Sequence, residues 1–214
     1  MYIEQGGDGP DLLVLLHGLG ATAAVWSPLC EQAGERWRGR WLAMDLPGHG
    51  RSDQLDDYAL GQCAASVARA IRPHVDPAGR VVVLGHSFGG VIALALATGW
   101  FGVTPHRVFG AGIKVAWTDE ELGRMQALAA QPARYFPTQA EASQRYLKVS
   151  GLAGIAAADS PVAQRGVVQD PAGWRLAMDP RAFGVGKPPV AQLLALARCP
   201  LHLGRAAGDA PVTL

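Results

Sequence analysis

This chain of 214 residues has few charged side chains, few cysteines and no long hydrophobic run. Only 17% of its residues are charged, and 19 basic residues nearly balance 18 acidic ones, for a net charge of +1. Such a balance argues against a nucleic-acid or anionic-membrane surface. No apolar run approaches the roughly 20 residues of a membrane span, and the first residues do not resemble a secretory signal. We expect a cytoplasmic protein.

The cysteines argue against a small protein that is held together by disulfides or zinc. Cys30, Cys63 and Cys199 are odd in number, far apart and without a CxxC pair. This spacing argues against a disulfide framework or a cysteine zinc site. We expect reduced thiols.

Short apolar runs alternate along the chain with segments of helical periodicity. The runs predict strands over residues 12–16, 41–44, 81–84 and 108–115, and a further strand at Leu201 and Leu203. Helical spacing covers residues 22–34, 58–71 and 90–101. This order predicts an α/β fold, with a mostly parallel central sheet and helices on both faces. We assign residues 1–115 and 190–214 to this core domain.

Residues 116–189 break the alternation. They contain no clear strand, several short helix-like pieces and many prolines and glycines. Because the segment is longer than a simple crossover, we expect a helical lid that folds over the core. The alternative is a set of ordinary connecting helices packed on the sheet.

A serine lies between two glycines at the end of the third predicted strand, in the sequence Gly85-His86-Ser87-Phe88-Gly89. Glycine at both second neighbours, on a strand-to-helix turn, is the nucleophile-elbow pattern. A side chain at either glycine would collide with neighbouring backbone. The turn would raise the Ser87 hydroxyl above the sheet, near the positive end of the following helix.

Glycine-rich turns follow the first two predicted strands. Residues 17–20 read His-Gly-Leu-Gly, and residues 45–52 read Asp-Leu-Pro-Gly-His-Gly-Arg-Ser. In the first turn the N–H of Leu19, together with the N–H of Phe88, could hold the oxyanion of a tetrahedral intermediate.

These three motifs, in this order, resemble those of the α/β-hydrolase superfamily. The resemblance covers about residues 12–115 and resumes near residue 199. It implies that Ser87 is the nucleophile, that the Leu19 and Phe88 amides form the oxyanion hole, and that Asp209, after a late strand, is the catalytic acid. Asp119 is the alternative acid, at a position that some members use.

The same resemblance implies the reaction. We expect a serine hydrolase that acts on an ester-like or other activated carbonyl substrate through an acyl-enzyme, without a metal or organic cofactor. Thioesterases, lactonases, C–C hydrolases and acyltransferases share these motifs. Aromatic residues in the lid, with little charge near them, favour a small apolar acyl or ring-containing substrate.

One competing motif overlaps the first glycine turn. Residues 18–23 match G-x-G-x-x-A after a strand, and Asp45 could then serve as the ribose-binding acid of a dinucleotide site. That interpretation leaves the elbow at Ser87 unexplained.

The resemblance also requires a histidine after the acid, and none follows Asp209. Alternation turns His86 away from the side that Ser87 faces, and His202 is expected in the core. His17 and His49 are expected to be structural or to line the pocket, with His49 the least unsuitable base. The other two, His74 and His106, should lie at the opposite sheet edge.

Two interpretations therefore stay open. In the first, which we favour, the sequence is truncated before the catalytic histidine. These 214 residues alone would then be inactive and would self-associate through an exposed sheet edge. In the second, the protein is a catalytically inactive ligand-binding relative that lacks the base.

Overall fold

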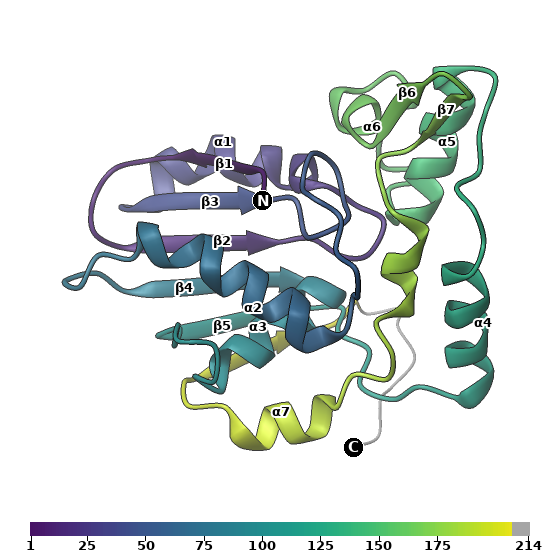
Figure 1. Cartoon of the computed structure of the whole chain (residues 1–214). Helices are drawn as coiled ribbons and strands as arrows, with labels where there is room; N and C mark the ends of the chain where they lie inside the picture. Colours follow the sequence, from purple (N-terminus) through teal and green to yellow (C-terminus); the bar gives the residue numbers. More distant parts are fainter. Residues whose placement is uncertain (207–214) are drawn as a thin grey trace.

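The computed structural model describes residues 1–206, so the predicted acid Asp209 lies outside the described residues. At its centre is a six-stranded sheet with the order β1-β3-β2-β4-β5-β8 (Figure 1). β1 is antiparallel to β3, and all other neighbouring strands are parallel. The predicted sheet is therefore confirmed. The strands are β1 (Ile3–Gly6), β2 (Leu12–Leu16), β3 (Arg40–Met44), β4 (Val81–His86), β5 (Arg107–Ala111) and β8 (Leu201–Gly204).

Helices cover both faces of this sheet. Alternate residues of β2 enter different cores: Val14 packs in the larger core, whereas Leu15 packs in a smaller one on the opposite face. The larger core is closed by α2 (Leu60–Ile71), α3 (Phe88–Ala97) and α7 (Val190–Leu196), and the smaller by the 3₁₀ helix η1 (Ala23–Trp26) and α1 (Ser27–Arg36). A short 3₁₀ helix, η2 (Arg72–His74), continues α2.

Helix α3 is the central helix of the molecule. All ten of its residues are buried, as expected for a helix that is apolar on every side. Within residues 1–206, no helix is both long and apolar enough to cross a membrane.

Residues 116–189 form a separate group of elements beyond the carboxyl ends of the strands, on the right in Figure 1. Contrary to the expectation of no strand, the segment contains a two-stranded hairpin. Its turn has a clear cause, because the Asp170 side chain accepts a hydrogen bond from the Ala172 N–H and Gly173 has a φ of 127°. The elements are α4 (Asp119–Ala129), α5 (Gln139–Val149), α6 (Pro161–Arg165), β6 (Val167–Asp170), β7 (Gly173–Leu176) and η3 (Pro180–Gly184).

Polar contacts attach this inserted segment to the core domain. The Tyr146 hydroxyl lies 3.3 Å from the hydroxyl of Thr22, and the Tyr58 hydroxyl donates to Asp179 over 2.8 Å. The segment also has its own small core, built around the buried ring of Tyr146. Arg165 forms an ion pair with Glu4 of β1.

The last described strand, β8, is the outermost strand of the sheet on its side. His202, expected in the core, is instead exposed and stacks on Phe109 of β5 with 4.8 Å between ring centroids. The expectation fails because no helix of residues 1–206 packs over this part of the face, where Phe109 is 37% exposed. Self-association through this edge stays a prediction.

Candidate active site

Ser87 lies in a strained turn between the central strand β4 and the buried helix α3. Its φ of 50° and ψ of −117° make it the one non-glycine residue with a positive φ among residues 1–206. The Ser87 N–H donates to the Ala111 carbonyl over 2.8 Å, and the Ser87 carbonyl accepts from the Val91 N–H over 3.1 Å. These contacts hold a conformation that costs on the order of 1–3 kcal/mol. The backbone therefore has the geometry of a nucleophile elbow.

The two glycines around this turn are required by close backbone contacts. A Cβ atom on Gly85 would lie 2.4 Å from the carbonyl oxygen of Gly89. A Cβ atom on Gly89 would lie 2.3 Å from the carbonyl oxygen of Leu16 and 2.5 Å from that of His17. The predicted collision with neighbouring backbone is thus confirmed at both positions.

The loop of residues 17–20 lies directly against the Ser87 turn. A Cβ atom on Gly18 would lie 3.2 Å from the Cβ atom of Ser87. In the described part of the chain, the N–H groups of Leu19 and Phe88 donate to no acceptor. Two amides without acceptors therefore lie near the serine, one in the loop of residues 17–20 and one at the first residue of α3.

Two buried histidines fix this loop to the turn of residues 46–49. The Leu46 N–H donates to Nε2 of His17 over 2.9 Å, and the Gly20 N–H donates to Nε2 of His49 over 3.0 Å. Because Nε2 accepts in both rings, Nδ1 carries the proton and donates to a backbone carbonyl, that of Gly18 or Pro47. The expected structural role of both histidines agrees with these contacts.

Neither buried histidine is available as a base for Ser87. Burial lowers the pKa of His17 to about 4 and that of His49 to about 3, so both rings are neutral at pH 7. Both nitrogens of each ring are already bonded to the backbone. His49, the least unsuitable base by sequence, therefore holds the loop instead.

Asp45 is also engaged by the backbone. Its Oδ1 accepts from the Ala23 N–H over 2.7 Å and its Oδ2 accepts from the Arg51 N–H over 2.8 Å. Burial raises the pKa of this carboxyl group, and a Cβ atom on Gly50 would lie 2.0 Å from Oδ2. A ribose-binding role for Asp45 is incompatible with this packing, which argues against a dinucleotide site.

His86 lies closer to the serine than its strand position predicts. Its Nδ1 would be 3.0 Å from a Cβ atom on Gly18, the same atom that would contact Ser87. Strand alternation does not extend to Ser87, because the positive φ reorients its side chain. No hydrogen bond joins His86 to Ser87 in the described residues, and burial lowers the pKa of His86.

The remaining predicted residues lie apart from the serine. His106 is at the amino end of β5, where its Nδ1 accepts from the Val81 N–H over 3.1 Å, and His74 lies in η2 at the same edge of the sheet. Asp119 is the exposed first residue of α4, and no described contact joins it to Ser87.

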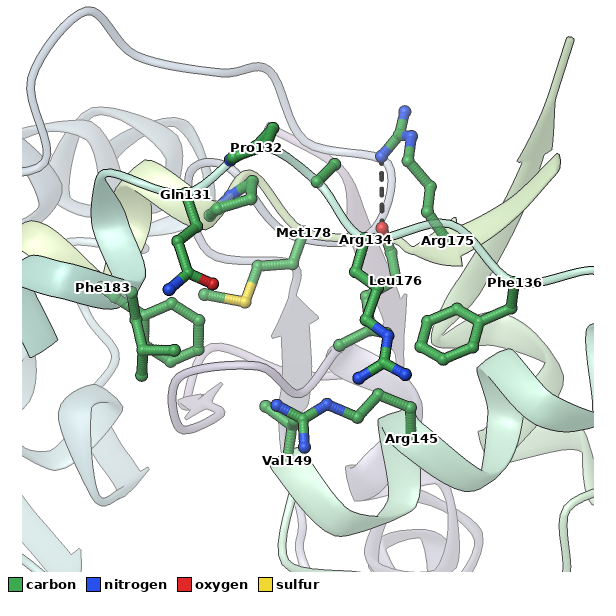
Figure 2. Close-up of a pocket in the computed structure, with 13 residues that line it drawn as sticks. Gln131, Pro132, Arg134, Phe136, Arg145, Val149, Arg175, Leu176, Met178 and Phe183 are labelled. Atoms are coloured by element: carbon green, nitrogen blue, oxygen red, sulfur yellow. Dashed lines mark hydrogen bonds between the residues drawn. The ribbon is translucent and has the colours of Figure 1, made fainter. Parts of the chain in front are cut away.

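A cavity of about 160 Å³ lies within the inserted segment and was not found from the sequence (Figure 2). It lies between the α4–α5 connection, α5 and the chain from β7 to η3. Two of its residues touch the loops described above: a Cβ atom on Gly20 would lie 2.3 Å from Cγ1 of Val149, and Met178 forms a β-bridge with His49. The cavity wall is therefore continuous with the loop that carries Leu19.

Charge distinguishes this cavity from the expected apolar pocket. Arg134, Arg145 and Arg175 line it beside apolar side chains. Each arginine precedes or follows an aromatic residue in the sequence, so the expectation of little charge near the lid aromatics is wrong. These three Arg–aromatic pairs in the sequence could have revealed the positive charge of the cavity.

A mostly parallel sheet with a strained serine between its central strand and a buried helix defines the class of the α/β-hydrolase fold. Residues 13–213 match the family model described as alpha/beta hydrolase family, and the chain belongs to this family.

Curated relatives match about half of this chain. A pimeloyl-[acyl-carrier protein] methyl ester esterase from Methylococcus capsulatus is 38% identical over 98 residues, which are 45% of this chain and 35% of the relative. The acetyltransferase component of the acetoin cleaving system from Pseudomonas putida (a dihydrolipoyllysine-residue acetyltransferase) is 36% identical over 108 residues, 50% of this chain and 27% of the relative. The match thus spans about a third of these relatives.

Among solved structures, E-2-(acetamidomethylene)succinate hydrolase superposes with a TM-score of 0.72 at 21% identity. The superposition covers 94% of this chain and 74% of that one. At this identity the likeness shows the fold alone.

We expect the close approach at Gly89 to be measurable as stability. Gly89→Ala places a methyl group against two carbonyl oxygens and should lower the free energy of unfolding by at least about 2 kcal/mol in urea denaturation. The matched control is Gly61→Ala in α2, where no atom lies within 4 Å. There alanine should stabilise by about 0.5–1 kcal/mol. Equal unfolding midpoints for the two variants would contradict the described packing.

The buried histidines predict a loss of stability at mildly acidic pH. Unfolded histidine binds a proton below about pH 6.5, whereas His17 and His49 stay neutral in the folded state until about pH 4 and 3. The unfolded state then binds more protons, so the free energy of unfolding should fall by about 2 kcal/mol per ring between pH 7 and 5. His49→Gln, whose amide oxygen can still accept from the Gly20 N–H, should remove one ring's share of this loss. An unchanged pH dependence in that variant would refute the assignment.

Proposed function

We propose that this protein is a serine hydrolase that cleaves an ester-like substrate through an acyl-enzyme. The observation that carries the proposal is the strained conformation of Ser87 at the head of α3, beside two amides without acceptors. A relative named as a methyl ester esterase supports the choice of an ester. Thioester, lactone and other acyl substrates would require the same groups.

In the proposed reaction, Oγ of Ser87 loses its proton and bonds to the substrate carbonyl carbon. The N–H groups of Leu19 and Phe88 stabilise the oxyanion of the tetrahedral intermediate, a contribution of roughly 10²–10³ in rate for one such donor. The intermediate collapses as the C–O bond to the leaving alcohol breaks and the alcohol takes a proton. Water then attacks the acyl-enzyme in the same manner and releases the acid and Ser87.

None of the residues discussed above is assigned as the general base. All six histidines of the sequence lie within residues 1–206, and no hydrogen bond of the described residues joins any of them to the Ser87 hydroxyl. We therefore propose that the base is a histidine that this sequence does not contain. Asp209 would orient that histidine and stabilise its protonated form.

A second function is favoured by the same absence of a suitable base among the described residues. A protein with this loop geometry and cavity but no base would bind an acyl ligand without hydrolysing it. Labelling of Ser87 distinguishes the two functions.

We expect a fluorophosphonate probe to label the complete natural protein and to lose the label in Ser87→Ala. The probe reacts with a serine only where a base and an oxyanion hole activate it, so labelling measures the proposed machinery directly. Mass spectrometry of the labelled peptide checks the site. Ser143→Ala, which removes a serine of α5 in the inserted segment, is the matched control. Equal labelling of wild type and Ser87→Ala would exclude Ser87 as the nucleophile.

The two candidate acids are separated by paired substitutions in the same complete protein. Asp209→Asn should lower kcat for a methyl ester by roughly 10³–10⁴, since a triad acid fixes the tautomer of the histidine. Asp119→Asn, at the exposed start of α4, should change kcat less than twofold. Steady-state kinetics with matched thermal melts measure both. The reverse ranking would assign the acid to Asp119.

A further inference from the structure

Three arginines line the cavity in the inserted segment, but only one of them has an acidic partner. Arg175 pairs with Asp170 over 2.9 Å and donates to the Leu176 carbonyl over 3.2 Å. Within residues 1–206, Arg134 and Arg145 form no ion pair. Two full positive charges beside the cavity are thus not neutralised by an acidic residue in the part of the chain that the structure describes.

The surroundings of these two arginines add no net charge, because one acidic and one basic residue lie beside them. Glu141 and Lys148 lie on the same rim, and Glu141 is within 4.0 Å of neither guanidinium. The local balance of the rim is therefore cationic.

Figure 2 shows the Arg134 side chain directed toward that of Arg145, and both side chains line the cavity. The Arg134 guanidinium lies 5.0 Å from the centre of the Phe136 ring, which helps to fix its position. Two guanidinium cations beside one cavity repel each other. An anion bound between them would replace that repulsion with charge-assisted hydrogen bonds. Guanidinium groups are suited to the paired oxygens of a carboxylate or phosphate.

Apart from Gln131, the rest of the cavity lining is apolar, and it leads toward the proposed reaction site. Val149, Leu176, Met178 and Phe183 line it. Val149 packs on Gly20, next to Leu19, so an alkyl chain within the cavity would run from the loop of residues 17–20 toward the arginines. Methionine adapts its shape to such flexible chains.

We propose that this cavity binds a substrate chain that ends in an anionic group, with Arg134 and Arg145 as its receptor. The inference rests on the proposed function, because it places the ester at Ser87 and the anion at the far end of the acyl chain. The shared chemistry is an oxyanion with two or more terminal oxygens, carried by a carboxylate or by a phosphate monoester. Arg134 and Arg145 select the substrate and take no part in the bond cleavage.

Binding to the complete Ser87→Ala protein tests the cavity without requiring hydrolysis. Three ligands of one chain length are titrated by calorimetry: methyl octanoate, monomethyl suberate, and the methyl ester of 8-phosphonooxyoctanoic acid. The two anionic ligands should bind roughly 10- to 100-fold more tightly than methyl octanoate, as expected for charge-assisted hydrogen bonds. The tighter of the two identifies carboxylate or phosphate. Equal affinity for all three ligands would overturn the proposal.

Arginine substitutions in the same background assign the receptor. Arg134→Gln and Arg145→Gln should each reduce the anionic preference about tenfold and leave methyl octanoate affinity within twofold. Arg124→Gln is the control, because it removes the same charge from the exposed surface of α4, where Arg124 pairs with Glu120. An equal loss in Arg124→Gln would overturn the assignment and indicate a diffuse charge effect.

The outcome is separable from that of the proposed function. A wild-type protein that the fluorophosphonate does not label at Ser87, with the anionic preference present in Ser87→Ala, would refute the hydrolase and retain the cavity. Normal labelling with no anionic preference would retain the hydrolase and refute this inference.

Discussion

The hydrogen bond from the Gly20 N–H to the buried His49 ring is the interaction on which the geometry of the site depends. It exists only while Nε2 of His49 is unprotonated, and burial ensures this by lowering the pKa to about 3. The bond leaves the Leu19 N–H, one residue earlier, free of a partner beside Ser87. The same histidine forms the β-bridge to Met178 of the inserted segment. His49 thus connects the loop beside the serine, through its ring, to the wall of the cavity, through its backbone.

The strain at Ser87 is balanced by the packing of α3. A positive φ at a non-glycine residue costs on the order of 1–3 kcal/mol, whereas the ten residues of α3 are all buried against the sheet and its neighbouring helices. At about 25 cal/mol for each Å² of apolar surface removed from water, this burial exceeds the strain several times over. The helix can therefore begin directly after the serine. Phe88 then becomes its first residue, with an N–H that no helical carbonyl can reach.

Sequence patterns predicted the core best where one physical cause dominated. Apolar runs identified β2, β3 and β4, because strands covered on both faces must be apolar throughout. The antiparallel β1 was missed, since its Glu4 and Gln5 interrupt any such run. The hairpin of residues 167–176 was missed because its short strands carry polar residues, although the Asp-Pro-Ala-Gly turn was visible. His202 was misplaced because burial depends on what covers a face, which alternation within one strand does not reveal.

The sequence likewise predicted one part of the candidate site and missed another. The glycine requirements at residues 85 and 89 follow from local backbone geometry, so the motif predicted them. The pairing of His49 with Gly20 and the placement of Arg134 and Arg145 at one cavity join residues from separate turns and helices, which no local pattern encodes. This separation has a physical consequence. Tyr146 and its neighbours give the inserted segment its own core, so side chains that line the cavity can change without disturbing the bonds that hold Leu19 beside Ser87. Val149 and Met178 are the exceptions, because their contacts with Gly20 and His49 make them part of both the cavity and the loops.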